Sequence, residues 1–239
     1  CPILAAGARD KAMDSHIGAA GVQPGAIWIN KTGRRFANEG TAENIGDIGP
    51  LYGKQPDGIV WSVLDQANID RLAENGSEIS IGEFVVFGRP LDRLRMELDQ
   101  DVADGVAFAA NTPEELAEKI GVSPENFAAT VAAYNEACAA GDDKEFFKQE
   151  KYLRPLSIPP FYAVALATGT MGSAGGIRIN GNMQVVDKDY EPIPGLYAVG
   201  LDATGLYGDS YNMEVPGAAN GFAHTSSRIA GRHFAAQQA

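Results

Sequence analysis

The side chains best suited to chemistry lie in a short loop near the C-terminal end of the chain, Tyr207-Gly208-Asp209-Ser210-Tyr211. The hydroxyl of Tyr211 can donate a hydrogen bond to a ligand oxygen or act as an acid, and Ser210 can donate beside it. Thr168 and Thr170, in an earlier glycine-rich stretch, supply two more hydroxyls. The sequence has no cluster of His, Cys, Asp and Glu at metal-ligand spacing and no nucleophilic-serine motif. By residue type alone, these hydroxyls can donate hydrogen bonds to a ligand.

A strand, a glycine loop and a helix must position that loop. Residues 195–200 form a short apolar run with glycine at both ends, which predicts a buried strand. Gly200 allows a sharp turn after the strand, and Gly205 keeps the following loop free of bulk. Pro216 then opens a helix that we expect to run to Arg232, with its free N–H groups and positive dipole end directed at the ligand. This arrangement suits a ligand with electron-rich oxygens.

The composition limits the class of protein and its partners. The chain has 239 residues, enough for one large domain or two modest ones, and 45% hydrophobic residues, as in ordinary globular proteins. A net charge of −12 argues against nucleic acid and anionic membrane surfaces as partners. No apolar run is long enough to span a bilayer. The 2 cysteines are too few for a disulfide framework, so the redox compartment of the protein stays undetermined.

The middle of the chain predicts a hairpin and two capped helices. Residues 25–39 contain two short runs that flank a polar turn with glycine, which is typical of a hairpin. Thr112 and Ser123 each precede a proline, as helix N-caps do when proline occupies the first helical position. Gly121 and Gly141 are the expected ends of these two helices.

Three sets of motifs resemble the fumarate reductase/succinate dehydrogenase flavoprotein family. They are Gly195-Leu196-Tyr197-Ala198-Val199-Gly200 with its following loop and helix, Asn30-x-x-Gly33-x-Arg35-Phe36-x-Asn38-Glu39, and the series Thr112-Pro113-Glu114-Glu115-Leu116-Ala117, Thr130-Val131-Ala132-Ala133-Tyr134-Asn135 and Pro159-Pro160-Phe161-Tyr162-Ala163. The last series resembles the capping domain shared by fumarate reductases, urocanate reductases and 3-ketosteroid 1-dehydrogenases. Chance similarity of helix caps does not account for its order and spacing.

The resemblance implies FAD as the cofactor and a reaction at a carbon–carbon bond. Hydride passes between flavin N5 and one carbon of a C=C or CH–CH bond, while a protein group adds or removes a proton at the adjacent carbon. The final helix points its N-terminus at the flavin pyrimidine ring. The cofactor-contacting positions that the resemblance implies are Gly200, Asp202, Gly205, Gly217, Ala218 and Ala219.

The resemblance also implies roles for two catalytic residues. Glu39 matches a glutamate of the proton-delivery chain in fumarate reductases, whereas the hairpin by itself allows a surface pair with Arg35. Tyr211 matches a tyrosine that hydrogen-bonds a ketone oxygen in ketosteroid dehydrogenases, and a packed loop aromatic is the alternative. Thr168, Thr170 and Ser210 are the substrate-binding candidates.

The chain departs from fumarate reductases where they bind a dicarboxylate. Ile69 stands where spacing places their catalytic arginine, and Arg71, two residues later on a helix, points about 200° away. No histidine occurs at Thr168-Gly169, and Tyr211 replaces an arginine that grips a carboxylate. We therefore expect an enoate or enone substrate rather than fumarate.

The expected fold is an α+β capping domain joined to a partial α/β, Rossmann-like FAD-binding domain. Because no Gly-x-Gly-x-x-Gly is present and the chain opens at Cys1, we expect a fragment that lacks the N-terminal half of that domain. Residues 1–25 are the expected tail of the missing half, 26–165 the capping domain, and 166–239 the end of the FAD-binding domain.

Three functions remain open for this fragment. The first is an FAD-dependent oxidoreductase acting on an activated C=C or CH–CH bond, and the second is a 3-ketosteroid-type dehydrogenase. The third is a non-catalytic capping module that binds no flavin by itself. The electron donor and the substrate stay undetermined, and no metal is expected.

Overall fold

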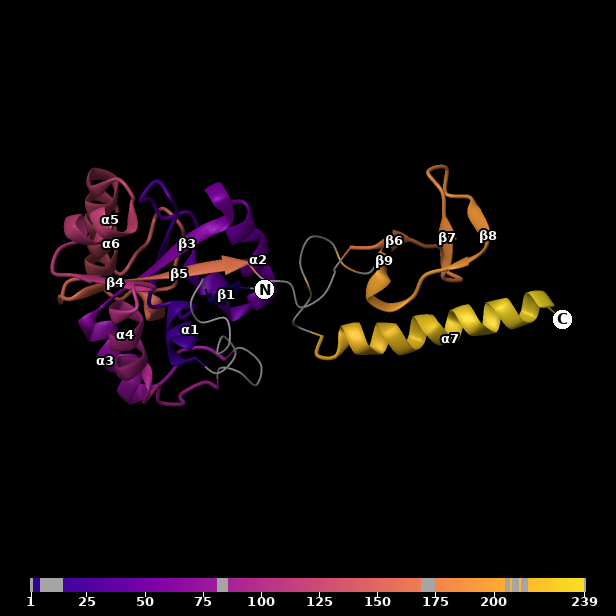
Figure 1. Cartoon of the computed structure of the whole chain (residues 1–239), viewed down its shortest axis with the longest axis horizontal. Helices are drawn as coiled ribbons and strands as arrows, with labels where there is room; N and C mark the ends of the chain where they lie inside the picture. The colour runs from indigo at the N-terminus through magenta and orange to yellow at the C-terminus, as the bar shows by residue number, and fades with distance from the viewer. Residues whose placement is uncertain are drawn as a thin grey trace. The chain divides into compact units, whose positions relative to one another are not determined.

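The structure is a computed structural model that describes residues 2–4, 15–80, 86–168, 175–204, 207, 211 and 215–238. The predicted site residues Thr170, Gly205 and Ser210 lie outside the described residues. The chain divides into two compact units, Cys1–Gly169 (unit 1) and Thr170–Ala239 (unit 2). Both units contain helices and strands (Figure 1), which confirms the mixed α/β composition expected from the sequence. Within the described ranges, no helix is both long and apolar enough to cross a membrane.

Unit 1 is built around one antiparallel sheet. Its elements in chain order are β1 (Pro2–Leu4), α1 (His16–Gly21), β2 (Ile27–Ile29), η1 (Glu39–Glu43), α2 (Ile45–Gly53), η2 (Pro56–Gly58), β3 (Ile59–Asp65), α3 (Gln66–Asn75), α4 (Leu94–Ala103), β4 (Ala107–Ala110), α5 (Pro113–Ile120), α6 (Pro124–Ala140), η3 (Glu150–Tyr152) and β5 (Phe161–Thr168). The strand order is β1-β5-β3-β2, and β4 also pairs with β5. The central pair, β3 and β5, places Ile59 opposite Ala167 and Asp65 opposite Phe161.

Alternating side chains of the sheet pack into two separate hydrophobic cores, one on each face of the sheet. On β3, Val60 and Leu64 pack with residues of α1, α2, α3 and α4. Val63, between them, packs on the other face against α5 and α6. This alternation follows from the two-residue period of a strand. In Figure 1, α5 and α6 accordingly lie together on one side of the sheet, with α1, α3 and α4 on the other.

Local capping chemistry sets the ends of α5 and α6 as the sequence predicts. The hydroxyl of Thr112 accepts the Glu115 N–H at the start of α5, and Ser123 does the same for Asn126 at the start of α6. Gly121 and Gly141 end the two helices in the left-handed conformation, with φ of 72° and 66°. These two predictions are confirmed.

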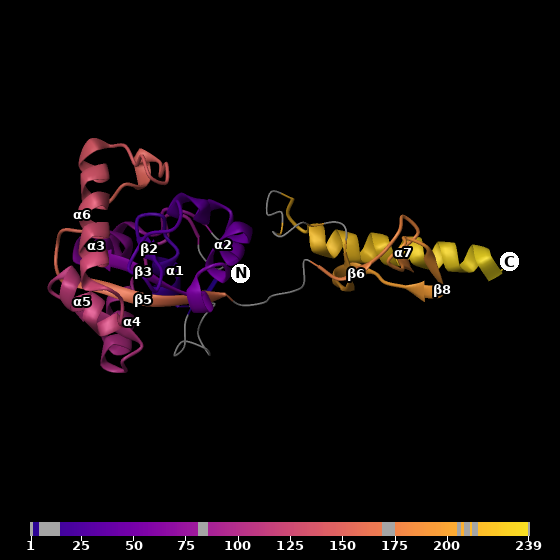
Figure 2. The same ribbon diagram turned by 90° about the horizontal axis from the view of Figure 1, so that it is seen from above.

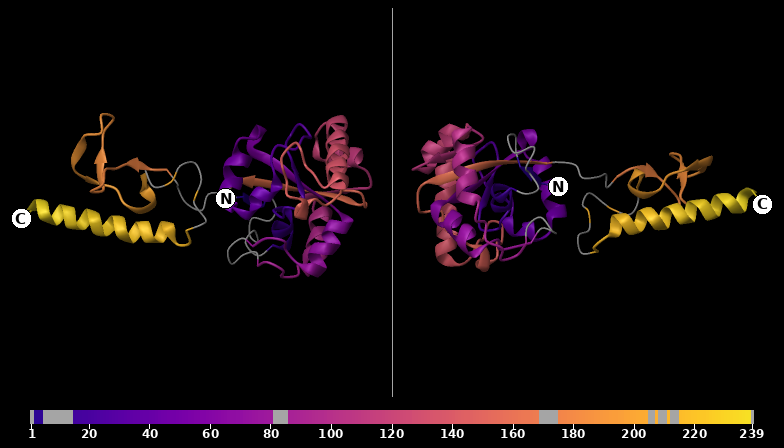
Figure 3. Two further views of the ribbon diagram at one scale, coloured as in Figure 1. Left: turned by 180° about the vertical axis from the view of Figure 1, so that it is seen from behind. Right: turned by 60° about the horizontal axis from the view of Figure 1, so that its bottom comes forward.

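Unit 2 has two short strand pairs and one long helix. Its elements are β6 (Ile177–Arg178), β7 (Gln184–Val186), β8 (Pro192–Tyr197), η4 (Gly200–Asp202), β9 (Ala203–Thr204) and α7 (Ala218–Gln238). β6 and β9 pair in parallel, whereas β7 and β8 are antiparallel. The helix runs along the strands of this unit in the views of Figure 1, Figure 2 and Figure 3.

The core of unit 2 is small and its apolar surface is large. Buried apolar side chains are Val185, Ala198 and Ala203, with Phe222 of α7 packed against them. The predicted strand over residues 195–200 is β8, which begins and ends three residues earlier and is exposed except at Tyr197. The apolar pattern therefore predicts the strand, but within residues 195–200 burial is confined to Ala198 and Gly200, which follow the strand.

Candidate functional site

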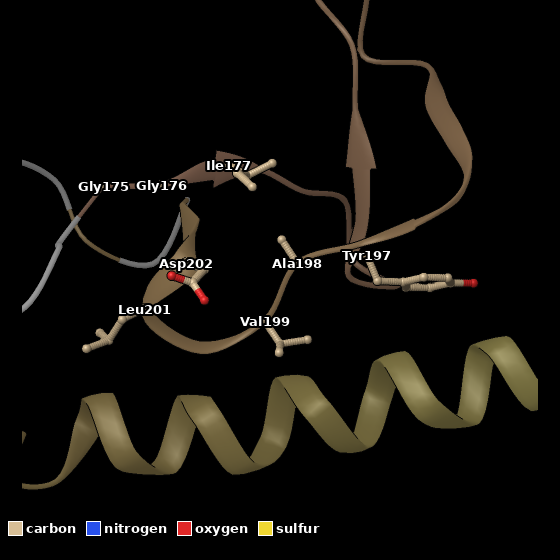
Figure 4. A pocket seen from close by; sticks show the side chains of 8 residues that line it. All are labelled: Gly175, Gly176, Ile177, Tyr197, Ala198, Val199, Leu201 and Asp202. Carbon is tan, nitrogen blue, oxygen red and sulfur yellow. The ribbon is translucent and has the colours of Figure 1, made fainter.

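Unit 2 contains a hollow where β6, the end of β8 and η4 meet (Figure 4). It has a volume of about 510 Å³ and is lined by Gly175, Gly176, Ile177, Tyr197, Ala198, Val199, Leu201 and Asp202. Backbone and apolar side chains form most of its wall. Among these lining residues there is no cationic side chain to pair with an anion. The hollow therefore suits a flat, weakly polar group better than a phosphate or a carboxylate.

Gly176 permits the close approach of β6 to η4 that shapes this hollow. A Cβ atom added at Gly176 would lie 2.4 Å from the carbonyl oxygen of Asp202. Any other residue would force the two backbones apart, so glycine is required here by space. Sequence reasoning missed this position, and the available signal was the pair Gly175-Gly176 directly before a strand.

The turn into η4 is fastened to α7 by hydrogen bonds. Gly200 has a φ of 62°, and its N–H donates to the Ser226 hydroxyl oxygen over 2.9 Å. The same hydroxyl donates to the carbonyl oxygen of Phe222 over 2.6 Å. Gly200 lies between two lining residues, Val199 and Leu201. Its hydrogen bond to Ser226 therefore attaches this part of the lining to α7. Of the predicted cofactor positions, Asp202 lines the hollow directly.

Tyr211 contacts the start of α7, where three predicted cofactor positions lie, Gly217, Ala218 and Ala219. Gly217 precedes the helix with a φ of 78°, and the Ala218 N–H donates to the carbonyl oxygen of Val215 over 3.1 Å. The Ala219 N–H donates to the Tyr211 hydroxyl oxygen over 3.1 Å. Tyr211 thus caps one free donor of the helix and keeps its own O–H proton for another acceptor.

Tyr207 packs against Tyr211 beside the same helix end. The two ring centroids are 5.0 Å apart and the rings are tilted by 40°. Among the described residues, no hydrogen-bond partner is found for the buried Tyr207 hydroxyl oxygen. Burial, together with the neighbouring Tyr211, raises the pKa of Tyr207. Tyr207 therefore keeps its proton more firmly than an ordinary tyrosine.

The remaining predicted substrate residue, Thr168, belongs to unit 1. It is the last residue of β5 and is exposed. Its methyl group is 4.0 Å from where a Cβ atom on Gly53, at the end of α2, would lie. The roles predicted for Thr168, and for Thr170, Ser210 and Gly205 outside the described residues, stay predictions.

Glu39 lies in the core of unit 1, bonded on both carboxylate oxygens. Arg35 donates from Nε to Oε1 over 2.9 Å and from Nη2 to Oε2 over 2.7 Å. The Trp28 N–H donates to Oε1 over 3.1 Å, and Lys148 Nζ is 3.2 Å from Oε2. The Glu39 side chain is 0% exposed. The pairing with Arg35 that the hairpin suggests is therefore present, but in the interior and not at the surface.

Two more charged residues complete this buried network. Asp143 accepts from Arg35 Nη2 over 2.9 Å. Lys148 donates to the Ala26 carbonyl over 2.8 Å and to the Tyr134 hydroxyl over 2.9 Å. Two positive and two negative charges thus cancel inside the unit. Lys148 and Asp143 were not found from the sequence, because they lie more than 100 residues from Arg35 and Glu39 along the chain.

The network keeps Glu39 ionised. Burial alone would raise the pKa of Glu39, but Lys148 and Arg35 outweigh it, so the pKa is lowered. Burial lowers the pKa of Lys148, against the pull of Glu39. As placed in the structure, Glu39 is a permanent carboxylate with saturated oxygens, and its predicted part in proton delivery stays a prediction.

The chain is similar to curated reductases and to solved structures of a dehydrogenase and a reductase. The vinyl phenol reductase of Lactiplantibacillus plantarum is 38% identical over 220 residues, which are 91% of this chain and 44% of that protein. The 3-ketosteroid Δ1-dehydrogenase structure from Sterolibacterium denitrificans aligns with a TM-score of 0.70 at 24% identity, over 99% of this chain and 42% of the other. A flavocytochrome c3 fumarate reductase structure aligns with a TM-score of 0.53 at 26% identity, over 97% of this chain and 35% of the other.

The matched proteins are much longer than this chain. The chain spans less than half the length of the curated relatives it matches. The family model for an FAD binding domain matches residues 8–217, which include most of both units. The predicted resemblance to fumarate reductase-like flavoproteins and ketosteroid dehydrogenases is confirmed, and the chain belongs to the FAD binding domain family.

Proposed function

We propose that this chain is the lid and the flavin-ring end of an FAD-dependent oxidoreductase that reduces or forms an activated carbon–carbon double bond. Unit 1 is the lid, and unit 2 is the end of a Rossmann-like FAD-binding domain. The proposal rests on the family, on the hollow of unit 2 and above all on the contact of Tyr211 with the first turn of α7.

The strands of unit 2 support its assignment to a larger parallel sheet. The parallel pair of β6 and β9 is only two residues long, and parallel sheets are stable when both faces are covered. Ile177 of β6 is 50% exposed and Leu196 of β8 is 46% exposed. Exposed apolar side chains on these two short strand pairs are the expected contacts for further strands and helices of an FAD-binding domain.

The described residues of unit 2 fit the ring system of FAD. When bound, FAD supplies hydride transfer at N5. The hollow has an apolar wall and a volume suited to a flat ring. The Ala218 and Ala219 N–H groups are bonded to the Val215 carbonyl and the Tyr211 hydroxyl, so the support from α7 is its dipole, whose positive end favours negative charge on the pyrimidine side of a flavin. Gly200, Asp202, Gly217, Ala218 and Ala219 are the described residues that would hold it.

Tyr211 polarises the substrate in this proposal. Its hydroxyl oxygen accepts from the Ala219 N–H, so its own proton points to another acceptor. A hydrogen bond that accepts from an amide strengthens the donor hydroxyl by polarising it. Donation to a carbonyl or phenolic oxygen of the substrate makes the conjugated carbon more electrophilic.

The substrate class follows from the residue at position 211. Tyr211 stands where a carboxylate-gripping arginine is expected in fumarate reductases, so this position offers a hydroxyl and no cation. We infer an uncharged or singly charged alkene, with a vinyl arene or enone preferred to fumarate. The vinyl phenol reductase relative supports this choice. A ketosteroid-type dehydrogenase is the second candidate, favoured by the same position of Tyr211.

The test is anaerobic reoxidation of the flavin-loaded protein after reduction with dithionite. We expect a vinyl phenol or an enone to restore the oxidised flavin spectrum, and fumarate to do so far more slowly. Tyr211→Phe should keep the flavin and slow reoxidation by about 10²- to 10³-fold. Tyr190→Phe, which removes the hydroxyl of a tyrosine that is 70% exposed, is the matched control. Undiminished turnover in Tyr211→Phe would exclude this role. Absence of flavin from the full-length protein would leave only the non-catalytic module.

A further inference from the structure

Three asparagines of this chain are followed directly by glycine: Asn75, Asn180 and Asn220. Asparagine is a chemically labile residue, because the backbone nitrogen of the next residue can attack its side-chain amide carbon. Glycine as the next residue leaves that attack unhindered, since it has no Cβ atom and wide conformational freedom. The surroundings of the attacking nitrogen and of the side-chain amide therefore decide which of the three asparagines is deamidated.

At Asn75 and Asn220 the attacking nitrogen is already engaged in a helix. Asn75 is the last residue of α3, and Asn220 lies in α7. Each following glycine N–H donates to the carbonyl oxygen four residues earlier, over 3.1 Å at Gly76 and 2.8 Å at Gly221. Gly76 is also packed so closely that an added Cβ atom would lie 2.5 Å from the Gly88 carbonyl carbon. Neither backbone can turn toward its own asparagine without breaking these contacts.

Asn180 and Gly181 lie instead in the turn that leads from β6 to β7. Gly181 is exposed, and no atom lies within 4 Å of the place where its Cβ atom would be. The Met183 N–H closes the turn by donating to the Asn180 carbonyl oxygen over 2.9 Å. Among the described residues, no acceptor is bonded to the Gly181 N–H. The attacking nitrogen is therefore free, and the backbone of Gly181 has room to rotate.

The side-chain amide of Asn180 is held by donors that favour the attack. Its Oδ1 accepts the Asn182 N–H over 3.0 Å and the Gln184 N–H over 3.1 Å. Its Nδ2 donates to Gln184 Oε1 over 3.1 Å. Two backbone N–H groups at a carbonyl oxygen stabilise the negative charge that this oxygen acquires when a nucleophile adds to the carbon. The turn thus supplies an oxyanion site for attack on its own asparagine.

We propose that Asn180 is the site at which this chain deamidates, through a cyclic imide formed with Gly181. The Gly181 nitrogen forms a bond to Asn180 Cγ, the bond from Cγ to Nδ2 breaks, and ammonia leaves with the proton of the Gly181 N–H. Water then opens the imide at one of its two carbonyl carbons and leaves aspartate or isoaspartate at this position. Water is the only co-reactant, and no oxidation or reduction occurs.

The two products change the turn in different ways. Aspartate still accepts the N–H groups of Asn182 and Gln184, but it adds a negative charge and loses the donor to Gln184 Oε1. Isoaspartate lengthens the backbone by one carbon atom, so the bridge between Ile179 and Val185 cannot keep its register. That bridge follows β6, which carries Ile177 in the wall of the hollow (Figure 4). Isoaspartate should therefore disturb unit 2 more than aspartate does.

The experiment is prolonged incubation of the whole chain at mildly alkaline pH, followed by peptide mapping with mass spectrometry and by enzymatic methylation of isoaspartate. We expect the Asn180 peptide to convert about 3- to 10-fold faster than the Asn75 and Asn220 peptides, the factor that one backbone hydrogen bond represents. Asn180→Gln and Gly181→Ala should each abolish the isoaspartate signal. Gly221→Ala is the matched control and should leave the rate at Asn180 unchanged.

The same incubation in concentrated urea separates the effect of the fold from that of the sequence. We expect the three rates to converge once the hydrogen bonds of both helices are lost. Conversion of Asn75 or Asn220 in the folded chain as fast as Asn180 would overturn the inference. An unfolded chain that kept the order of the folded one would also overturn it, because the neighbouring residues and not the turn would then select the site.

Discussion

Glu39→Gln is the substitution that most directly tests the buried network of unit 1. It keeps the size of the side chain and removes its charge. Arg35 would lose a carboxylate that it holds with two hydrogen bonds, and Lys148 would lose an ion pair of 3.2 Å. The network would then carry one uncompensated positive charge, because only Asp143 would remain to balance two cations.

The magnitude follows from the burial of the partners. The side chains of Arg35, Glu39, Asp143 and Lys148 are 0–3% exposed. Removing one partner of a buried ion pair costs about 3–5 kcal/mol, because a buried charge is left unpaired. Since domains are stable by only about 5–15 kcal/mol, the loss would remove a large part of the stability of unit 1. Glu39→Gln with Lys148→Met removes one charge of each sign, so this double variant should recover about 2 kcal/mol relative to the sum of the single variants.

Urea unfolding followed by tryptophan fluorescence measures these differences. Trp28 is a suitable reporter, because its ring is fully buried in unit 1 and its backbone N–H donates to Glu39. Glu74→Gln, in an exposed pair with Arg95, should change the free energy of unfolding by less than about 0.5 kcal/mol. A loss below about 1 kcal/mol in Glu39→Gln, or strict additivity in the double variant, would refute the reasoning.

The pH dependence of this difference has a definite sign. The folded-state pKa of Glu39 lies below its usual value. A group with a lowered pKa contributes stability that is present above its unfolded pKa and is lost as the pH falls through its folded pKa. The stability gap between the wild type and Glu39→Gln should therefore be full at neutral pH and should close progressively in acid.

Two substitutions in unit 2 test how its hollow is built. Gly176→Ala places a methyl group 2.4 Å from the Asp202 carbonyl oxygen, and should cost about 1–3 kcal/mol and weaken flavin binding, measured by thermal unfolding and by FAD titration. Ser226→Ala leaves the Gly200 N–H without its acceptor, and should cost about 1–3 kcal/mol and speed the hydrogen exchange of that amide. Unchanged unfolding in either variant would contradict the contacts that we describe.

Elements with local chemical signals could be predicted from the sequence. The caps of α5 and α6 depend on hydroxyls and glycines within a few residues of each helix end, so Thr112 and Ser123 are sufficient to place them. α2 (Ile45–Gly53) contains Gly46, Gly49 and Pro50, which are poor helix formers. It forms a helix because Ile48 and Tyr52 are buried in the core of unit 1, a tertiary effect that outweighs propensity.

Parts of the site could be predicted for the same reason, and other parts could not. The glycine turn at Gly200 and the helix near Ala218 follow from local patterns, and the structure brings Asp202 to the hollow and Tyr211 to the helix start. Gly176 could not be identified, because its requirement comes from a backbone 26 residues away, at Asp202. A close approach between two backbone segments that are far apart in the sequence gives no signal in the residues around either segment.

The pair of glutamates on η1 shows why a matching motif does not by itself assign a proton donor. Glu39 stands in the motif and Glu43 outside it, yet charge partners from Arg35 and Lys148 fix the first as a carboxylate, and solvent reaches only the second. We therefore expect Glu39→Gln to lower stability whether or not this residue takes part in proton delivery. Lower stability in Glu39→Gln with an unchanged pH dependence of flavin reoxidation would assign the motif glutamate to the buried network alone.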